Sequence, residues 1–142
     1  MRTGTIRLTI DSRIDQVHMI GLAIKGICAS IPMTDEDTYQ TELCIVEAVN
    51  NAVEHGYRNE AGHEVCVDAT VEGRALTLRV LDRGVPLDWE SVQERRSDAT
   101  LLDEGGRGFL IMESYMDRVS YARVGDENVL TLVKGIRAEA HP

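Results

Sequence analysis

Two neighbouring segments with strict alternation of apolar and polar residues constrain the fold of this chain most. They read HEVCVDATVEG at residues 63–73 and RALTLRVLDRG at residues 74–84. Apolar residues at every second position are typical of strands that bury one face, and Glu72, Gly73 and Arg74 form a turn with a glycine at its centre. The sequence therefore predicts an antiparallel hairpin in the middle of the chain.

Helices are predicted on both sides of this hairpin. An alternating strand at residues 5–11 leads into a helical pattern that Asp11 or Ser12 can cap. A second helix begins near Thr34, whose side chain can cap it ahead of three acidic residues that suit the positive end of the helix dipole, and it runs to about Gly56. A short helix follows the glycines at residues 105–108 and runs to about residue 115.

A second hairpin closes the chain, with strands DRVSYAR and NVLTLVKGI joined by a turn at Gly125 and Asp126. The resulting order, β-α-α-β-β-α-β-β, does not alternate as doubly wound folds do. It predicts an α+β two-layer sandwich, in which a mostly antiparallel mixed β-sheet carries its helices on one face. A length of 142 residues suits a single domain with one core, covering residues 1–142.

The charge balance excludes several classes of partner. A formal net charge of −9 disfavours binding to the phosphates of DNA or RNA and to an anionic membrane surface. No segment reaches the roughly 18 apolar residues that span a bilayer, and the first residues lack the apolar region of a secretory signal. We expect a cytoplasmic protein with no direct nucleic-acid or membrane partner.

The cysteines and histidines show no metal-binding pattern. Cys28, Cys44 and Cys66 are odd in number and lack C-x-x-C spacing, which predicts reduced core thiols. The four histidines, at 18, 55, 63 and 141, form no ligand pair on a helix. Any metal is therefore expected to arrive with a ligand.

The segment EAVNNAVEHGY, residues 47–57, places Glu47, Asn51 and His55 at four-residue spacing within the second helix. At 100° per residue these side chains share one sector, opposite the apolar valines. The face can be an ordinary solvated one. It can also leave space for a ligand, because the intervening residues Cys44 and Ala48 are small and the sector lacks Lys and Arg.

Two glycine-containing segments allow similar alternatives. In LDRGVPLD, an aspartate ends a strand. The segment is either a plain turn, or a binding site in which this carboxylate accepts a hydrogen bond from a base amine and Gly84 lets the ligand approach closely. In EGGRGFLIMESYMDRV, a glycine pair opens a helix; it is either a hinge or a phosphate site at the helix N-terminus. No Walker A motif occurs.

Taken in chain order, E-x-x-x-N-x-x-x-H, D-x-G-x-P and G-x-G at a helix start resemble the nucleotide-binding motifs of the GHKL (Bergerat-fold) ATPase superfamily. The wording of EAVNNAVEHGY and GGRGFLIMESYMDRVSY is most similar to the anti-sigma-factor serine-protein kinases of the RsbW and SpoIIAB type. The resemblance covers about residues 5 to 136. It implies the Bergerat ATP-binding fold with a lid loop at about residues 86–105.

The resemblance also implies a role for each matched residue. Glu47 matches the catalytic carboxylate, which accepts the proton of the attacking serine hydroxyl, and Asn51 matches the magnesium ligand. Asp82 matches the aspartate that recognises adenine. The remaining residues matched to ATP binding are His55, Gly84, Pro86, Gly106, Arg107 and Gly108. Arg95, Arg96 and Arg107 are the candidates for contact with the γ-phosphate.

One position departs from the family pattern. Many relatives open the last strand with Gly-Thr, and this threonine helps the aspartate to hold the base. The present chain reads ENVLTLVK, with Asn128 as the nearest counterpart. Asparagine can also form hydrogen bonds.

The activity implied by the resemblance is that of an ATP- and Mg²⁺-dependent protein serine kinase in a partner-switching system. Such a protein holds a sigma factor inactive, phosphorylates a serine of a STAS-type anti-sigma-factor antagonist, and forms a homodimer. Two alternatives stay open: a kinase of this type that regulates a partner other than a sigma factor, and a non-catalytic ATP-binding interaction module. The presence of Glu47 favours the enzyme over the non-catalytic module.

Overall fold

A computed structural model describes residues 4–95 and 106–137 of the chain. The elements, in chain order, are β1 (Gly4–Asp11), a 3-10 turn (Ile14–Gln16), α1 (Val17–Ala29), α2 (Asp35–Asn51), a π-helical turn (Ala52–Gly56), β2 (Glu64–Glu72), β3 (Ala75–Asp82), α3 (Trp89–Arg95), α4 (Gly106–Tyr115), β4 (Arg118–Val124) and β5 (Glu127–Gly135). None of the helices in these two described ranges is long and apolar enough to cross a membrane.

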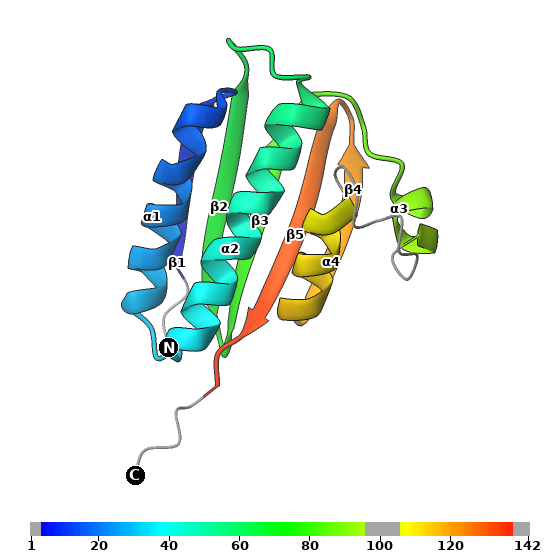
Figure 1. Ribbon diagram of the computed structural model, residues 1–142. Coiled ribbons are helices and arrows are strands. Elements are labelled where there is room, and N and C mark those ends of the chain that lie inside the picture. The colour runs from blue at the N-terminus through cyan, green and yellow to red at the C-terminus, as the bar shows by residue number, and fades with distance from the viewer. Residues whose placement is uncertain (1–3, 96–105, 138–142) are drawn as a thin grey trace.

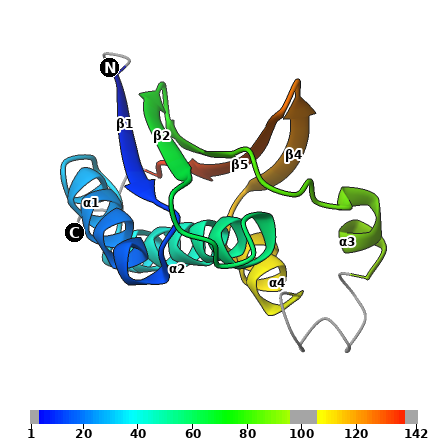
Figure 2. The same cartoon turned by 90° about the horizontal axis from the view of Figure 1, so that it is seen from above.

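The strands form one sheet in the order β1-β2-β3-β5-β4, and every pairing between neighbouring strands is antiparallel. Helices α1, α2 and α4 lie against a single face of this sheet, and α3 lies to one side beyond β4 (Figures 1 and 2). The predicted α+β two-layer sandwich is confirmed. Because β5 inserts antiparallel between β3 and β4, Asp82 at the end of β3 pairs with Asn128 at the start of β5, so that the loop after β3 and the β4–β5 turn meet at one end of the sheet.

Both predicted hairpins are present. Gly73 joins β2 to β3 with a φ of 61°, and Gly125 joins β4 to β5 with a φ of 64°. This left-handed conformation is the one that glycine adopts without a steric penalty. The turn residues therefore set the register of both hairpins.

The predicted cap of the first helix is wrong. The side chain of Asp11 accepts a hydrogen bond from the backbone nitrogen of Gly62 at 2.9 Å, and the Ser12 hydroxyl donates to the Glu60 carbonyl at 2.6 Å. These groups satisfy the loop before β2 instead of a helix end. Helix α1 starts only at Val17, after a 3-10 turn, and no side chain caps it.

The second helix matches its prediction at the start and differs at its end. The Thr34 hydroxyl accepts a hydrogen bond from the Asp37 backbone nitrogen at 3.0 Å, as expected of an N-cap. The α-helix stops at Asn51, and the expected last turn to Gly56 is π-helical. π-turns widen a helix locally and often occur at functional sites.

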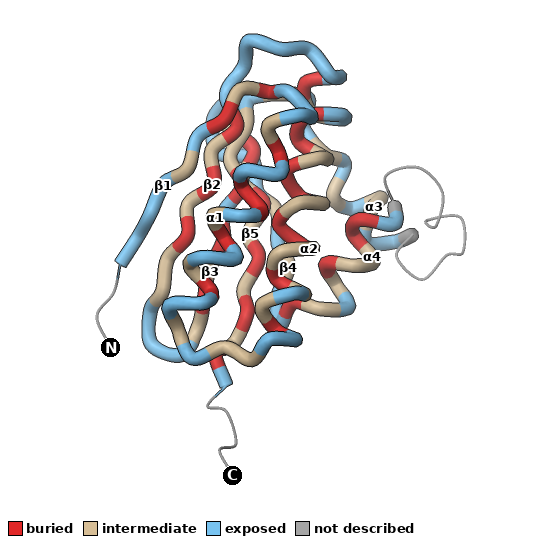
Figure 3. Tube along the Cα trace, turned by 60° about the vertical axis from the view of Figure 1, so that its left-hand side comes forward, coloured by how far each residue is buried: buried red, intermediate tan, exposed pale blue. Residues whose placement is uncertain are grey.

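The core lies between the sheet and the three helices, where buried segments of the strands face buried segments of the helices (Figure 3). Its largest fully buried side chains are Ile20, Ile24, Ile45, Leu76, Leu78, Met112 and Leu132. The three cysteines are free, as predicted, and Cys28 and Cys44 are buried. Cys66 is only half-buried, because it points to the face of the sheet that no helix covers, opposite its buried neighbours Val65 and Val67.

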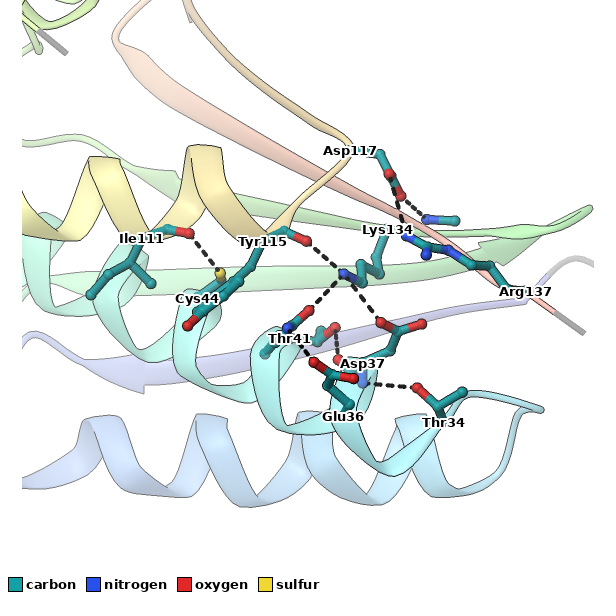
Figure 4. Close-up of polar contacts among 12 residues, drawn as sticks. Thr34, Glu36, Asp37, Thr41, Cys44, Ile111, Tyr115, Asp117, Lys134 and Arg137 are labelled. Atoms are coloured by element: carbon teal, nitrogen blue, oxygen red, sulfur yellow. Dashed lines mark hydrogen bonds and ion pairs between the residues drawn. The ribbon is translucent and has the colours of Figure 1, made fainter. Parts of the chain in front are cut away.

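One charged side chain is almost completely buried within this layer. Lys134 of β5 is 2% exposed; its Nζ donates to the Gln40 side chain at 3.1 Å and to the Tyr115 carbonyl at 2.5 Å, and lies 3.5 Å from the Asp37 carboxylate (Figure 4). Asp37 belongs to the first turn of α2, and Tyr115 ends α4. The ammonium group therefore ties the C-terminus of α4 and, through the Asp37 carboxylate, the N-terminus of α2 to the same strand. The cation suits the negative end of the α4 dipole, and the Asp37 carboxylate suits the positive end of the α2 dipole.

We predict that Lys134→Ala lowers the free energy of unfolding by about 2–4 kcal/mol, because it leaves the Asp37 carboxylate and the Tyr115 carbonyl without their partner. Lys134→Met, which keeps an unbranched apolar stem, should lose less. Urea denaturation measures both, and Lys25→Ala at an exposed position of α1 is the matched control, expected within about 0.5 kcal/mol of the parent. A loss for Lys134→Ala no larger than that of the control would contradict the prediction.

Candidate functional site

A cavity of about 320 Å³ lies between the end of α2, the loop after β3 and the first turns of α4. Small-molecule sites usually enclose roughly 300–1,000 Å³ and combine apolar walls with a few polar groups. The walls here include Ala48, Val80, Phe109 and Leu130, and the polar groups include Asn51, Asp82 and Asn128. The composition of the cavity therefore suits a ligand with an apolar, planar part and a polar part.

The cavity brings together residues that the sequence singled out on separate segments. Asn51 and His55 line it from α2 and the π-helical turn, and Asp82 and Pro86 line it from the end of β3 and the loop beyond. His55 is exposed, whereas Asn51 and Asp82 are partly buried. The line of polar residues on α2 is therefore not simply a solvated face.

Glu47 and Asn51 lie directly against the start of α4. A Cβ placed on Gly108 would lie 3.1 Å from Oε2 of Glu47 and 3.2 Å from Nδ2 of Asn51. Among the described residues, Nδ2 of Asn51 is the buried side-chain nitrogen or oxygen that has no hydrogen-bond partner. A buried polar atom without a partner is costly, and such atoms in folded proteins call for a missing ligand, ion or water.

The N-terminus of α4 completes this side of the site. The helix begins at Gly106, and Arg107 in its first turn is exposed. Of the other two arginines, Arg96 and the side chain of Arg95 lie outside the described residues, as do residues 96–105 of the expected lid. The described part of that segment differs from a plain loop, because Trp89–Arg95 form helix α3 and Trp89 packs edge-on against Phe109, with ring centroids 5.8 Å apart.

Asp82 ends β3 with its carboxylate held from two directions. Its Oδ1 accepts hydrogen bonds from the Gly84 backbone nitrogen and from Nδ2 of Asn128, both at 2.8 Å. Burial raises the pKa of the Asp82 carboxyl above its ordinary value, while these two hydrogen bonds and the nearby Arg123 charge oppose the rise. A partly buried carboxylate at the wall of a cavity is a typical ligand-binding group.

Gly84 is needed for a contact that the sequence did not reveal. Its Cα packs on the backbone of Gly56, so that a Cβ placed on Gly84 would lie 2.3 Å from the Gly56 carbonyl carbon and oxygen. The next residue, Val85, donates a backbone hydrogen bond to the Gly56 carbonyl at 2.7 Å. Gly56, expected only to stop the helix, also lies against Asp82, since a Cβ there would be 3.1 Å from its Oδ1.

Two tyrosines that the sequence analysis missed hold the loop after β3. The Tyr57 hydroxyl donates to the Glu64 carbonyl at 2.8 Å and accepts from the Arg83 backbone nitrogen at 2.7 Å. The Tyr121 hydroxyl accepts from the Leu87 backbone nitrogen at 2.9 Å and donates to Asn128 at 2.7 Å. Their alternating or helical sequence context gives no signal for these contacts, which depend on the tertiary fold.

The described residues hold no cluster of three or more histidine, cysteine, aspartate or glutamate side chains that would bind a metal by itself. Asn51 offers a single carboxamide, and a hard cation that takes one protein ligand must obtain the others from water or from a bound molecule.

Comparison with known proteins assigns the fold and the family. Residues 10–134 match the family described as Histidine kinase-like ATPase domain. The anti-sigma F factor of Anoxybacillus flavithermus is 30% identical over 118 residues, which cover 80% of each chain. The serine-protein kinase RsbW of Bacillus velezensis is 30% identical over 120 residues, covering 80% of this chain and 75% of the relative.

A solved structure supports the same fold. The crystal structure of the RsbU and RsbW domains of a Mycobacterium tuberculosis protein superposes with a TM-score of 0.68 at 21% identity. The match covers 93% of this chain and 32% of that one, so the present chain corresponds to about a third of it. The GHKL-type fold expected from the motifs is confirmed.

We predict that Gly84→Ala destabilises the protein by about 1–3 kcal/mol, because the added methyl group must push the loop away from the backbone of Gly56. The matched control is Gly26→Ala in α1, where a Cβ meets nothing within 4 Å and should raise stability by up to about 1 kcal/mol. Thermal and urea unfolding measure both variants. Equal changes in the two proteins would show that the Gly84 contact is unimportant.

We also predict that Asp82→Asn stabilises the free protein at neutral pH. A carboxyl whose pKa is raised on folding binds its proton more tightly in the native state, so its contribution to stability falls as the pH rises through the native pKa. The advantage of the variant should be absent in acid, below the ordinary pKa of 3.8, and complete above the raised value. Urea unfolding across this range tests the sign, with Asp126→Asn at a 77% exposed side chain as control.

Proposed function

Because this chain belongs to the histidine kinase-like ATPase domain family, we propose that it is an ATP-dependent protein serine kinase that also acts as an anti-sigma factor. The observation that carries the proposal is the arrangement around one cavity of Asp82 at one end and of Asn51 and Glu47 beside the N-terminus of α4 at the other. An elongated ligand with a base and a phosphate chain matches these two ends.

The end of the cavity at Asp82 suits an adenine ring. Apolar side chains from β3, β5 and α4 form walls around it, and a carboxylate oxygen can accept a hydrogen bond from the exocyclic amine of the base. Gly84 and Pro86 shape the loop that closes this end. We assign base recognition to Asp82, with Gly84 as the residue that allows the loop to approach.

The other end suits phosphates. Helix α4 presents its N-terminus, at Gly106 to Gly108, and the positive end of its dipole to the same space as Glu47 and Asn51. Arg107 in the first turn and His55 at the rim of the cavity add cationic or hydrogen-bonding capacity. These groups would bind and orient the phosphate chain.

The residues present fit a magnesium ion that arrives with ATP. The buried Asn51 carboxamide has an unpaired atom, and rotation of the amide by 180° presents its oxygen in place of the nitrogen. Mg²⁺ keeps several waters and accepts one or two protein ligands besides phosphate oxygens. When bound, the ion would neutralise charge on the phosphates and so favour phosphoryl transfer.

Glu47 is assigned the role of general base. Its carboxylate accepts the proton of a serine hydroxyl while the oxygen of that hydroxyl forms a bond to the γ-phosphorus, and the bond from the γ-phosphorus to the bridging oxygen breaks to release ADP. Glu47 precedes Asn51 by one helical turn on the same side of α2, and both side chains lie against Gly108. Proton acceptance and phosphate binding would therefore occur side by side.

The names of two relatives, anti-sigma F factor and serine-protein kinase RsbW, support a sigma factor as a partner and serine phosphorylation as the activity. We propose that the chain sequesters a sigma factor and phosphorylates a serine of a STAS-type antagonist, as a homodimer in the cytoplasm. A net charge of −9 is suited to a basic patch on the sigma factor. If nucleotide favours one partner-bound state, that partner must strengthen nucleotide binding by the same factor.

We predict that the parent protein transfers phosphate from Mg-ATP to a serine of a STAS-type antagonist. Glu47→Gln should bind ATP within about threefold of the parent and lose at least about a hundredfold in transfer rate. Asn51→Ala should lose the magnesium-dependent part of nucleotide binding. Radiolabel transfer from a panel of antagonist proteins and titration with a fluorescent ATP analogue measure the two effects.

The matched control is Glu36→Gln, the same change at an exposed position of the first turn of α2, which should keep both activities. Equal phosphorylation by the parent and by the Glu47 and Asn51 variants would remove the assigned roles. ATP binding by all proteins without transfer to any antagonist would favour a non-catalytic binding module.

A further inference from the structure

Asn128 occupies the centre of a hydrogen-bond network at the base end of the cavity. It lies on β5, in register with Asp82 of β3 on one side and Arg123 of β4 on the other, and is only 3% exposed. Its Nδ2 donates to Oδ1 of Asp82 at 2.8 Å and to the Gly84 carbonyl at 3.0 Å. Its Oδ1 accepts from the Tyr121 hydroxyl at 2.7 Å and from Arg123 at 2.8 Å.

The orientation of this carboxamide is fixed by its neighbours. The guanidinium of Arg123 can only donate hydrogen bonds, so the amide oxygen must face it. The carbonyl of Gly84 can only accept, so the amide nitrogen must face that side. A rotation of the amide by 180° would create two mismatches, and Nδ2 is therefore always the atom that meets Asp82.

This orientation determines what Asp82 can offer to a ligand. Its Oδ1 already accepts from Asn128 and from the Gly84 backbone nitrogen, and cannot carry a proton toward either donor. Among the described residues no donor contacts Oδ2. Oδ2 is thus the oxygen left to accept a hydrogen bond from a ligand, and the oxygen on which any proton must reside.

We propose that Asn128, held by Arg123, is a specificity-determining residue of the base pocket: it makes Asp82 present Oδ2 as an acceptor, and so selects a base with an amino group over one with a carbonyl in the same place. The inference rests on the proposed ATP binding and deepens it. A threonine at this position has one hydroxyl proton and could not donate to both Asp82 and Gly84. The asparagine can therefore contribute to base discrimination in a way that a threonine cannot.

The surroundings of Asp82 give a second consequence. The charged or titratable groups that face it, its cavity or its hydrogen-bond partners from the adjoining elements are His55, Tyr57, Arg83, Asp88, Tyr121, Arg123 and Glu127. Burial raises the pKa of Asp82, and the Asn128 hydrogen bond is the largest effect opposing that rise. Loss of Asn128 therefore favours protonation of Oδ2, which would then donate to a base carbonyl instead of accepting from an amine.

The test compares the equilibrium binding of Mg-ATP and Mg-ITP, which differ at this one exocyclic group, by displacement of a fluorescent nucleotide between pH 5.5 and 8. The parent should bind ATP at least about tenfold more tightly than ITP at pH 8, since an unmatched polar group in a buried site is strongly rejected. Asn128→Ala should reduce this ratio at least about fivefold, and the pH below which ATP binding weakens should move upward.

A merely structural role for Asn128 would weaken ATP and ITP equally and leave their ratio unchanged. Thr131→Ala, on the opposite face of β5, is the matched control and should keep the ratio of the parent. If Asn128→Ala does not fold, Arg123→Met decides the question, because Arg123 is exposed and its loss removes both a donor that holds the amide oxygen and the charge that opposes the raised pKa of Asp82; the ratio should fall at least about twofold.

An ATP-to-ITP ratio unchanged in the folded Asn128 variant, or in the Arg123 variant where it decides, would overturn this inference while leaving the proposed function intact. Failure of the parent to bind ATP would overturn the proposed function and the inference with it.

Discussion

The contact between Gly56 and Gly84 is the constraint on which the site depends. It joins the end of the second helix to the loop after the third strand. The backbone nitrogen of Val85 donates to the Gly56 carbonyl, and the two backbone segments approach too closely for a side chain on Gly84. Without it, the polar line on α2 and the carboxylate of Asp82 would have no fixed relation, because they lie on different layers of the sandwich. A binding cavity with polar groups at both ends requires that relation to be rigid.

The opposite end of the helical layer is fixed by a different kind of interaction. Lys134 reaches the first turn of α2 and the last carbonyl of α4 from the C-terminal end of β5 (Figure 4). The packing of two glycines at one end and a buried ion pair at the other therefore fix the position of these helices along the direction of the strands.

Much of this architecture could be predicted from periodicity, and the reasons for the exceptions are physical. The hairpins, the Thr34 cap and the start of α4 depend on local patterns, so short segments suffice to predict them. Asp11 and Ser12 were misassigned because a cap and a loop contact require the same side-chain oxygen, and only tertiary structure shows which donor is nearest. The half-exposed Cys66 was misplaced because cysteine was taken as a core residue by its type, whereas the alternation puts it on the polar face of β2 with Glu64, Asp68 and Thr70.

The site itself was predictable in its composition and not in its connections. The motifs identified Asn51, Asp82 and Gly108, whereas Tyr57 and Tyr121 carry no motif and were found only from their hydrogen bonds. Asn128 was identified in the sequence as the counterpart of the family's threonine, but its four hydrogen bonds could not be predicted from the sequence. Those four bonds also bear on evolution: replacing residue 128 alone leaves Arg123 and the Gly84 carbonyl without their partner, and replacing residue 123 alone removes one of the two donors to the amide oxygen. Residues 123 and 128 are therefore expected to covary, so that a substitution at one position is accompanied by a substitution at the other.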